Sequence, residues 1–168
     1  QRKAAVAELL RQHAPDIFSI QEALPHQTSE LAAALPDYAW FGVGRDASGD
    51  GEGVPVFYRK DRFTMLQSAT FWLSETPDQP SRGWDAALNR ICSYGQFEET
   101  SSRQRLWVIN CHFDHAGQTA RLESVRLLLS QIEKINPDGG PLVLMGDFNA
   151  EPESPPMVLL KQHLSDSR

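Results

Sequence analysis

The sequence has little of what marks several classes of protein. Its 168 residues include two cysteines, Cys92 and Cys111, and no apolar run approaches the roughly 20 residues that cross a bilayer as a helix. Lys and Arg number 16 against 22 Asp and Glu, a formal net charge of −6. These features exclude a disulfide scaffold and a membrane-spanning helix, and they argue against a broad basic surface for duplex nucleic acid. We expect both cysteines to be buried free thiols.

The rest of the composition is that of an ordinary globular chain, with 40% hydrophobic and 23% charged residues. A length of 168 residues is typical of one domain with its own core. The sequence contains no internal repeat and no low-complexity segment. Residues 1–168 are therefore interpreted as a single domain.

Hydrophobic periodicity and turn residues divide the chain into helices and strands. The first helix, over 1–13, places Val6, Leu9 and Leu10 on one stripe. Further helices are expected from Pro25 to residue 35, after Gly117, and from Pro155 with Ser154 as the capping residue. Apolar runs predict buried strands at 17–20, 106–109 and 142–145, and β-rich segments lie at 38–43, 54–58, 63–73 and 91–97.

The three apolar strands lead at their carboxyl ends to residues that can bind a metal ion or move a proton. Glu22 follows the first strand, His112 the second, and Asp147 with Asn149 the third. Polar groups at strand ends stand at a sheet edge, where loops open a cleft. Each residue alone has an ordinary structural explanation as a turn former or helix cap. The repetition at three strands indicates a functional site.

Asp147 and Asn149 are two residues apart, so in an extended segment both point to one side while Phe148 points into the core. Oxygen ligands of this kind suit Mg²⁺ or Mn²⁺. The alternative is a loop in which both side chains form turns with the backbone.

The segment from His112 to His115 also admits two interpretations. His-x-Asp-His resembles part of a transition-metal cluster, but an extended segment turns His115 away from His112 and Asp114. In the favoured interpretation, His112 donates a hydrogen bond to a phosphoryl oxygen.

These segments resemble three signatures of the endonuclease/exonuclease/phosphatase superfamily, also called deoxyribonuclease-I-like: Gln21-Glu22, 110–115 (Asn-Cys-His-Phe-Asp-His) and 146–150 (Gly-Asp-Phe-Asn-Ala). Four further segments resemble one bacterial branch of it, at 51–58, 71–77, 83–87 and 90–92. The resemblance runs in matching order from Glu22 to Asn149.

The resemblance implies an α/β fold in which two β-sheets stack face to face between helices, a four-layer α/β/β/α sandwich. Family members carry a further strand with an Asn at the amino end and a Ser-Asp-His segment at the carboxyl end. This sequence shows neither, so we expect a partial domain, incomplete at both ends.

The resemblance also implies roles for individual residues. Glu22 would ligate Mg²⁺, with Mn²⁺ as the other candidate. Asp147 would assist the metal, and Asn149 would hold a phosphate oxygen or assist the metal. Asp147 would also orient or deprotonate the attacking water. His112 would hydrogen-bond the phosphoryl group, and Glu52 would orient the His112 ring. Arg45, Arg90 and Arg121 are candidate substrate contacts, because their loops and helix flank the expected cleft.

The expected function is hydrolysis of a phosphoester by in-line attack of water, supported by a divalent cation. The acidic charge favours a small or lipid-derived substrate over duplex DNA, and a monomer is expected. Two alternatives remain open. One is a catalytically incompetent member or fragment that binds a ligand or partner, and the other is a different kind of metallophosphoesterase.

Overall fold

The computed structural model describes residues 2–167, with side chains from residue 5 to residue 167; residues 1 and 168, at the ends of two segments discussed above, lie outside the described part. The helices and strands follow one another in this order: α1 (Arg2–His13), β1 (Ile17–Ser19), α2 (Pro25–Ala34), β2 (Tyr38–Phe41), β3 (Val56–Arg59), β4 (Phe63–Trp72), β5 (Ile91–Glu99), β6 (Arg105–His112), α3 (Gln118–Ile135), β7 (Leu142–Asp147) and α4 (Pro155–Lys161).

The smaller of two sheets is antiparallel, with strand order β1-β3-β2. Val56 and Tyr58 of its central strand belong to a core shared with the larger sheet. Phe57, between them, is fully buried on the opposite side and stacks on Phe18 of β1. Because successive side chains of a strand point to opposite faces, Val56 and Tyr58 face the larger sheet and Phe57 faces away from it.

The larger sheet has strand order β4-β5-β6-β7. Its first three strands are antiparallel, whereas β7 runs parallel to β6 after the chain returns through α3. Parallel pairing brings the carboxyl ends of both strands to the same edge of the sheet. His112 consequently stands in register with Asp147.

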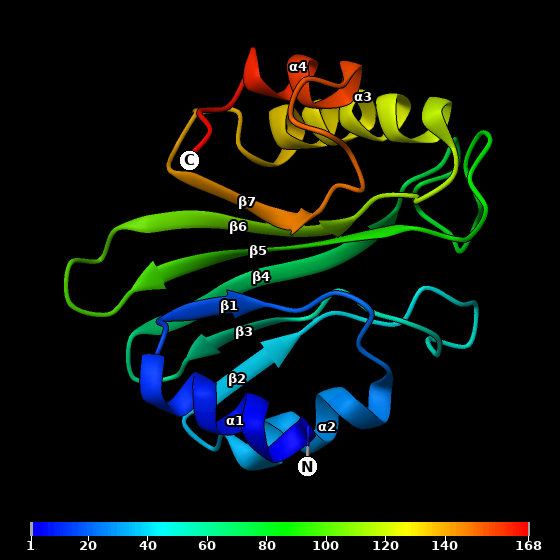
Figure 1. Cartoon of the computed structure of the whole chain (residues 1–168). Helices are drawn as coiled ribbons and strands as arrows, with labels where there is room; N and C mark the ends of the chain where they lie inside the picture. Colours follow the sequence, from blue (N-terminus) through cyan, green and yellow to red (C-terminus); the bar gives the residue numbers. More distant parts are fainter. Residues whose placement is uncertain (1, 168) are drawn as a thin grey trace.

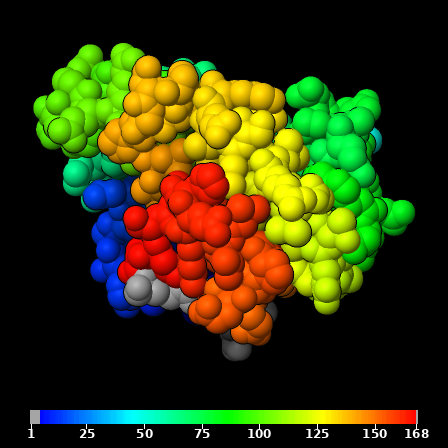
Figure 2. Space-filling model, turned by 90° about the horizontal axis from the view of Figure 1, so that it is seen from above, coloured from blue at the N-terminus to red at the C-terminus, as the bar shows by residue number. Residues whose placement is uncertain are grey.

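The two sheets lie against each other, with α1 and α2 outside the smaller sheet and α3 and α4 outside the larger one (Figure 1). Figure 2 shows α3 and α4 side by side on the outer face. One core cluster, which includes Phe97 and Val108, fills the space between the sheets. A second, which includes Ile109, Val125 and Leu128, lies between the larger sheet and its helices.

The helices and strands expected from the sequence are confirmed within the described residues, but their burial differs in three places. The strand at 17–20 was expected to be buried, yet all three residues of β1 are only partly buried. Val6 and Leu9 are 41% and 54% exposed, and α1 instead buries Ala7. The strand at 142–145 was expected to be buried, yet Val143 is 47% exposed. It belongs to β7, which pairs only with β6 among the described strands and stands at an edge of the sheet.

Cys92 and Cys111 are fully buried free thiols on paired positions of β5 and β6, as expected. Burial raises the pKa of both thiols. No helix in the described part of the chain is long and apolar enough to cross a membrane.

Candidate active site

Glu22 and Glu52 are held on neighbouring loops of the smaller sheet. Ala23 and Gly53 form an isolated antiparallel bridge with two backbone hydrogen bonds, at 2.8 and 3.3 Å. The bridge fixes the residue before each of them, Glu22 and Glu52. Glu22 is exposed and has a φ of +60°, an uncommon conformation for a residue other than glycine. Backbone strain at such a position is typical of functional sites.

His112 and Asp147 face each other across the parallel pair β6 and β7. His112 Nε2 lies 3.9 Å from Asp147 Oδ2. Gly146 is needed beside them because a Cβ on it would lie 2.2 Å from the Cys111 carbonyl oxygen, and its φ is +151°. The tight approach of the two strands explains the glycine before the aspartate.

Asn149 combines the two interpretations that the sequence left open. Its backbone N–H donates to Asp147 Oδ1 at 2.9 Å, which is the turn alternative. Its side chain nevertheless returns to the site, where Nδ2 donates to the Phe113 carbonyl at 2.9 Å and lies 3.1 Å from His112 Nε2. Phe148 packs edge-on against Phe113, as expected of a residue pointing into the core.

His112 is buried and surrounded by charge. Burial, and next the Arg90 guanidinium, lower its pKa below 6.5, whereas Asp147, Glu22 and Glu52 act in the opposite direction. The net lowering keeps the imidazole neutral at pH 7. The Asn149 amide nitrogen lies 3.1 Å from Nε2, and the Arg90 guanidinium lies against both ring nitrogens.

Arg90 is 4% exposed and joins the histidines and the aspartate of the 112–115 segment. Its Nη1 lies 3.0 Å from both ring nitrogens of His112, its Nη2 2.9 Å from His115 Nδ1, and its Nε 3.3 Å from Asp114 Oδ1. The strand ends at His112, so the expectation that His115 points away is wrong. A guanidinium among these three side chains contradicts the transition-metal interpretation.

Asn110 connects the two sheets beneath the site. Its Nδ2 donates to the carbonyls of Ile20 at 3.0 Å and Pro55 at 3.3 Å, both on the smaller sheet or its loops. Its Oδ1 accepts a hydrogen bond from Gln21 Nε2 at 2.7 Å. Glu22, the next residue after Gln21, is thereby tied to the strand that carries His112.

The oxygen donors present suit a hard divalent cation. Among the described residues, no group of three or more His, Cys, Asp or Glu side chains is placed to hold a metal ion. Mg²⁺ commonly keeps several waters and uses one or two carboxylates together with substrate phosphate. Two exposed carboxylates, Glu22 and Asp147, with the amide of Asn149 nearby fit that pattern. Zn²⁺ usually takes a fuller set of Cys and His ligands, which this site lacks within the described residues.

A sequence profile described as the Endonuclease/Exonuclease/phosphatase family matches residues 1–167. The chain belongs to this family. A mannosyl-6-phosphatase of Bacteroides thetaiotaomicron is 40% identical, with a TM-score of 0.93, over 96% of this chain and 61% of that one. A conserved protein of Enterococcus faecalis is 35% identical, with a TM-score of 0.93, over 99% of this chain and 65% of that one.

A protein of Acanthamoeba polyphaga mimivirus is 29% identical over 163 residues, 89% of this chain and 59% of the relative. The chain thus spans between 59% and 65% of the length of these three family relatives. It has the family's phosphoester hydrolase fold, with bacterial structural relatives, as the motifs at Glu22, His112 and Asp147 indicated.

The other residues singled out in the sequence have different surroundings. Arg45 Nη1 pairs with Glu52 Oε2 at 2.7 Å, and the effect of Glu52 on His112 is electrostatic. Arg121 Nη1 donates to the Asp114 carbonyl at 2.9 Å. The network that sequence reasoning missed is Arg90 with Asp114, because no spacing rule connects residues from a loop and a strand end.

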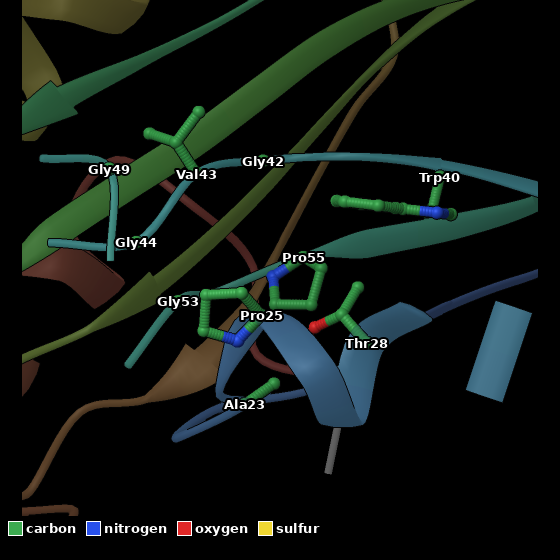
Figure 3. A pocket seen from close by; sticks show the side chains of 10 residues that line it. All are labelled: Ala23, Pro25, Thr28, Trp40, Gly42, Val43, Gly44, Gly49, Gly53 and Pro55. Carbon is green, nitrogen blue, oxygen red and sulfur yellow. The ribbon is translucent and has the colours of Figure 1, made fainter. Parts of the chain in front are cut away.

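A small apolar cavity of about 150 Å³ is lined in part by Ala23 and Gly53, the residues that follow Glu22 and Glu52 (Figure 3). Pro25 and Thr28 of α2, Trp40 of β2 and the backbone of the glycine-rich loop surround it. The Thr28 hydroxyl donates to the Leu24 carbonyl at 3.4 Å, so the one hydroxyl in the lining is engaged in its own helix. We assign this cavity to the packing of the loops that carry Glu22 and Glu52.

Proposed function

We propose that this chain carries the catalytic centre of a divalent-metal-dependent phosphoester hydrolase acting on a small or lipid-derived substrate. The observation that supports it most is the position of buried His112, whose Nε2 lies 3.9 Å from Asp147 Oδ2 while the charges of Glu22 and Glu52 act on the same ring. These carboxylates come from three separate segments, and a structural role in the fold requires no such convergence. Membership of the family supports the same reaction class.

In the proposed mechanism, Glu22 and Asp147 would hold Mg²⁺ or Mn²⁺, with Asn149 assisting. When bound, the cation stabilises negative charge on the phosphoryl and leaving-group oxygens. Asp147, whose side chain is 52% exposed, orients the attacking water and accepts its proton. His112 donates a hydrogen bond to a phosphoryl oxygen, and Arg90 and Asn149 hold the ring for this role.

The three arginines differ in what they can contact. Arg45 lines an open depression, although its side chain is only 15% exposed and pairs with Glu52, and it is the strongest candidate for the substrate. Arg90 acts through His112, and Arg121 supports the turn at Asp114. Small phosphorylated substrates are also favoured by the net charge of −6 and by the 40% identity to a mannosyl-6-phosphatase.

The test is Glu22→Gln in the full-length protein, because the amide removes the charge that binds the cation and keeps the shape. We expect kcat/KM to fall by at least about 100-fold on every phosphomonoester or phosphodiester that the wild-type protein hydrolyses. We also expect the Mg²⁺ requirement to weaken. Glu133→Gln, an exposed residue of α3, is the matched control and should retain activity.

Turnover assays with Mg²⁺, Mn²⁺ and EDTA complete the experiment. Activity that survives EDTA, or an unchanged rate in Glu22→Gln, would contradict the proposal. Binding of phosphate ligands by wild-type protein without turnover of any ester would favour the catalytically incompetent alternative.

A further inference from the structure

A second depression, with none of the residues of the apolar cavity, lies beside the candidate active site. Its volume is about 590 Å³, and it is lined by residues from two loops: Arg45, Asp46, Arg82, Ala87, Leu88 and Asn89. Pockets for small molecules commonly measure roughly 300–1,000 Å³. The depression is therefore much larger than a single phosphoryl group requires.

Both walls of the depression are connected to His112. On one wall, Arg45 pairs with Glu52, one of the three carboxylates that act on His112. On the other, the backbone N–H of Ala87 donates to Asp114 Oδ2 at 3.1 Å. Asp114 in turn pairs with Arg90, which contacts His112. A ligand in the depression would lie next to the reacting groups.

The two walls are also tied to each other. Trp72 Nε1 donates to the Arg45 carbonyl at 2.7 Å, and Asn89 Nδ2 lies 3.4 Å from the same oxygen. Two loops from distant parts of the sequence therefore meet at one carbonyl group. The two loops are therefore already held in place, and they lose little conformational entropy when a ligand binds in the depression.

The chemistry of the lining favours a neutral hydroxylated group. Glu52 balances the charge of Arg45, and the exposed Asp46 and Arg82 carry opposite charges. Leu88, 40% exposed, adds an apolar surface. None of the six lining residues is aromatic, so the depression offers no stacking platform for a nucleobase. Alternating acceptor, donor and apolar surfaces match the hydroxyls and the C–H face of a sugar ring.

We propose that this depression binds the sugar of a sugar phosphate, with Asp46 and Arg82 as specificity residues that hydrogen-bond its hydroxyls. The proposal rests on the proposed function, since the phosphoester must reach His112 and Asp147. Asp46 accepts hydrogen bonds from hydroxyl groups and Arg82 donates to them. Both residues are exposed, so their substitution leaves the core intact.

The experiment compares matched esters with and without a sugar. A hexose 6-phosphate and its methyl diester are paired with phenyl phosphate and methyl phenyl phosphate, in full-length protein with Mg²⁺. In Asp46→Asn and Arg82→Ala, the ratio of sugar to phenyl kcat/KM should fall roughly tenfold, chiefly through KM, as loss of a hydrogen bond to a charged group implies.

Arg126→Ala is the matched control, because Arg126 pairs with Glu123 on the outer helix α3. It should leave the ratio of sugar to phenyl kcat/KM unchanged. An unchanged ratio in both Asp46→Asn and Arg82→Ala would overturn the sugar assignment alone. Absence of turnover on all four esters would instead overturn the proposed function.

Discussion

Asp114 shows how one buried residue organises the surroundings of the candidate active site. Its carboxylate is 1% exposed and accepts hydrogen bonds from the backbone N–H groups of Ala87, Ala116 and Gly117. Burial alone would raise the pKa of Asp114, but these hydrogen bonds and the Arg90 guanidinium lower it well below its usual range. Arg90 therefore has two tasks, balancing this charge and contacting His112.

Removing the guanidinium tests the first task. Arg90→Met should lower the free energy of unfolding by about 3–5 kcal/mol, because it leaves the Asp114 carboxylate buried without its cation. Urea denaturation followed by circular dichroism measures the loss. Arg105→Met is the control: that side chain is 62% exposed, and the loss of its pair with Glu98 should cost less than about 1 kcal/mol. Equal losses in the two variants would contradict the assignment.

Helix α3 illustrates a boundary set by a distant segment. Its N-cap is Gly117, which has no side chain to satisfy the first N–H groups. Asp85, from the loop between β4 and β5, accepts hydrogen bonds from Ala120 N at 2.6 Å and Thr119 N at 3.2 Å. These hydrogen bonds, led by that from Ala120, lower the pKa of Asp85. The capping group thus lies 35 residues before the N–H that it satisfies.

Gly117 is required because the Asp85 loop approaches it closely. A Cβ at residue 117 would lie 2.6 Å from Asp85 Oδ1 and 2.7 Å from the Asp85 carbonyl oxygen. Gly117→Ala should therefore destabilise the protein by about 1–3 kcal/mol, although alanine is the better helix former. Thermal unfolding should show the change, and the neighbouring exposed Gln118→Ala should show almost none. A stabilised Gly117→Ala variant would refute the close approach.

At the scale of the whole molecule, the site depends on how the two sheets are aligned. Asp147 and Asn149 follow β7 of the larger sheet, whereas Glu22 and Glu52 belong to loops of the smaller sheet. Asn110 is fully buried and connects the two sheets through hydrogen bonds to Ile20, Pro55 and Gln21. Asn110 therefore helps to align the carboxylates of the two sheets, together with the apolar core between them.

Asn110→Ala should affect both stability and activity. Loss of the amide removes the hydrogen bonds to Ile20, Pro55 and Gln21, which costs about 2 kcal/mol. The carboxylates then lose their alignment with His112, and kcat/KM should fall about 10–100-fold on any ester the protein hydrolyses. Gln67→Ala removes an exposed side-chain pair with Gln96 and is the control. Full activity in a destabilised Asn110→Ala variant would contradict an aligning role.

The sequence predicted much of the local structure because its signals are local. Proline at helix starts, apolar runs of strand length and the residues after them located α2, β6, α4 and the positions of His112 and Asp147. Burial was predicted less well. The stripe of Val6 and Leu9 has helical spacing, yet periodicity does not say which face meets the protein, and α1 buries Ala7 instead.

What the sequence alone determined is the family, the order of secondary structure and the identity of the polar residues at three strand ends. The tertiary structure decided which side chains meet. Arg90 with Asp114, Asp85 with the start of α3, and Asn110 with Gln21 are contacts between residues 24, 35 and 89 positions apart. Such contacts depend on how sheets and loops pack in space, which no spacing along the chain encodes.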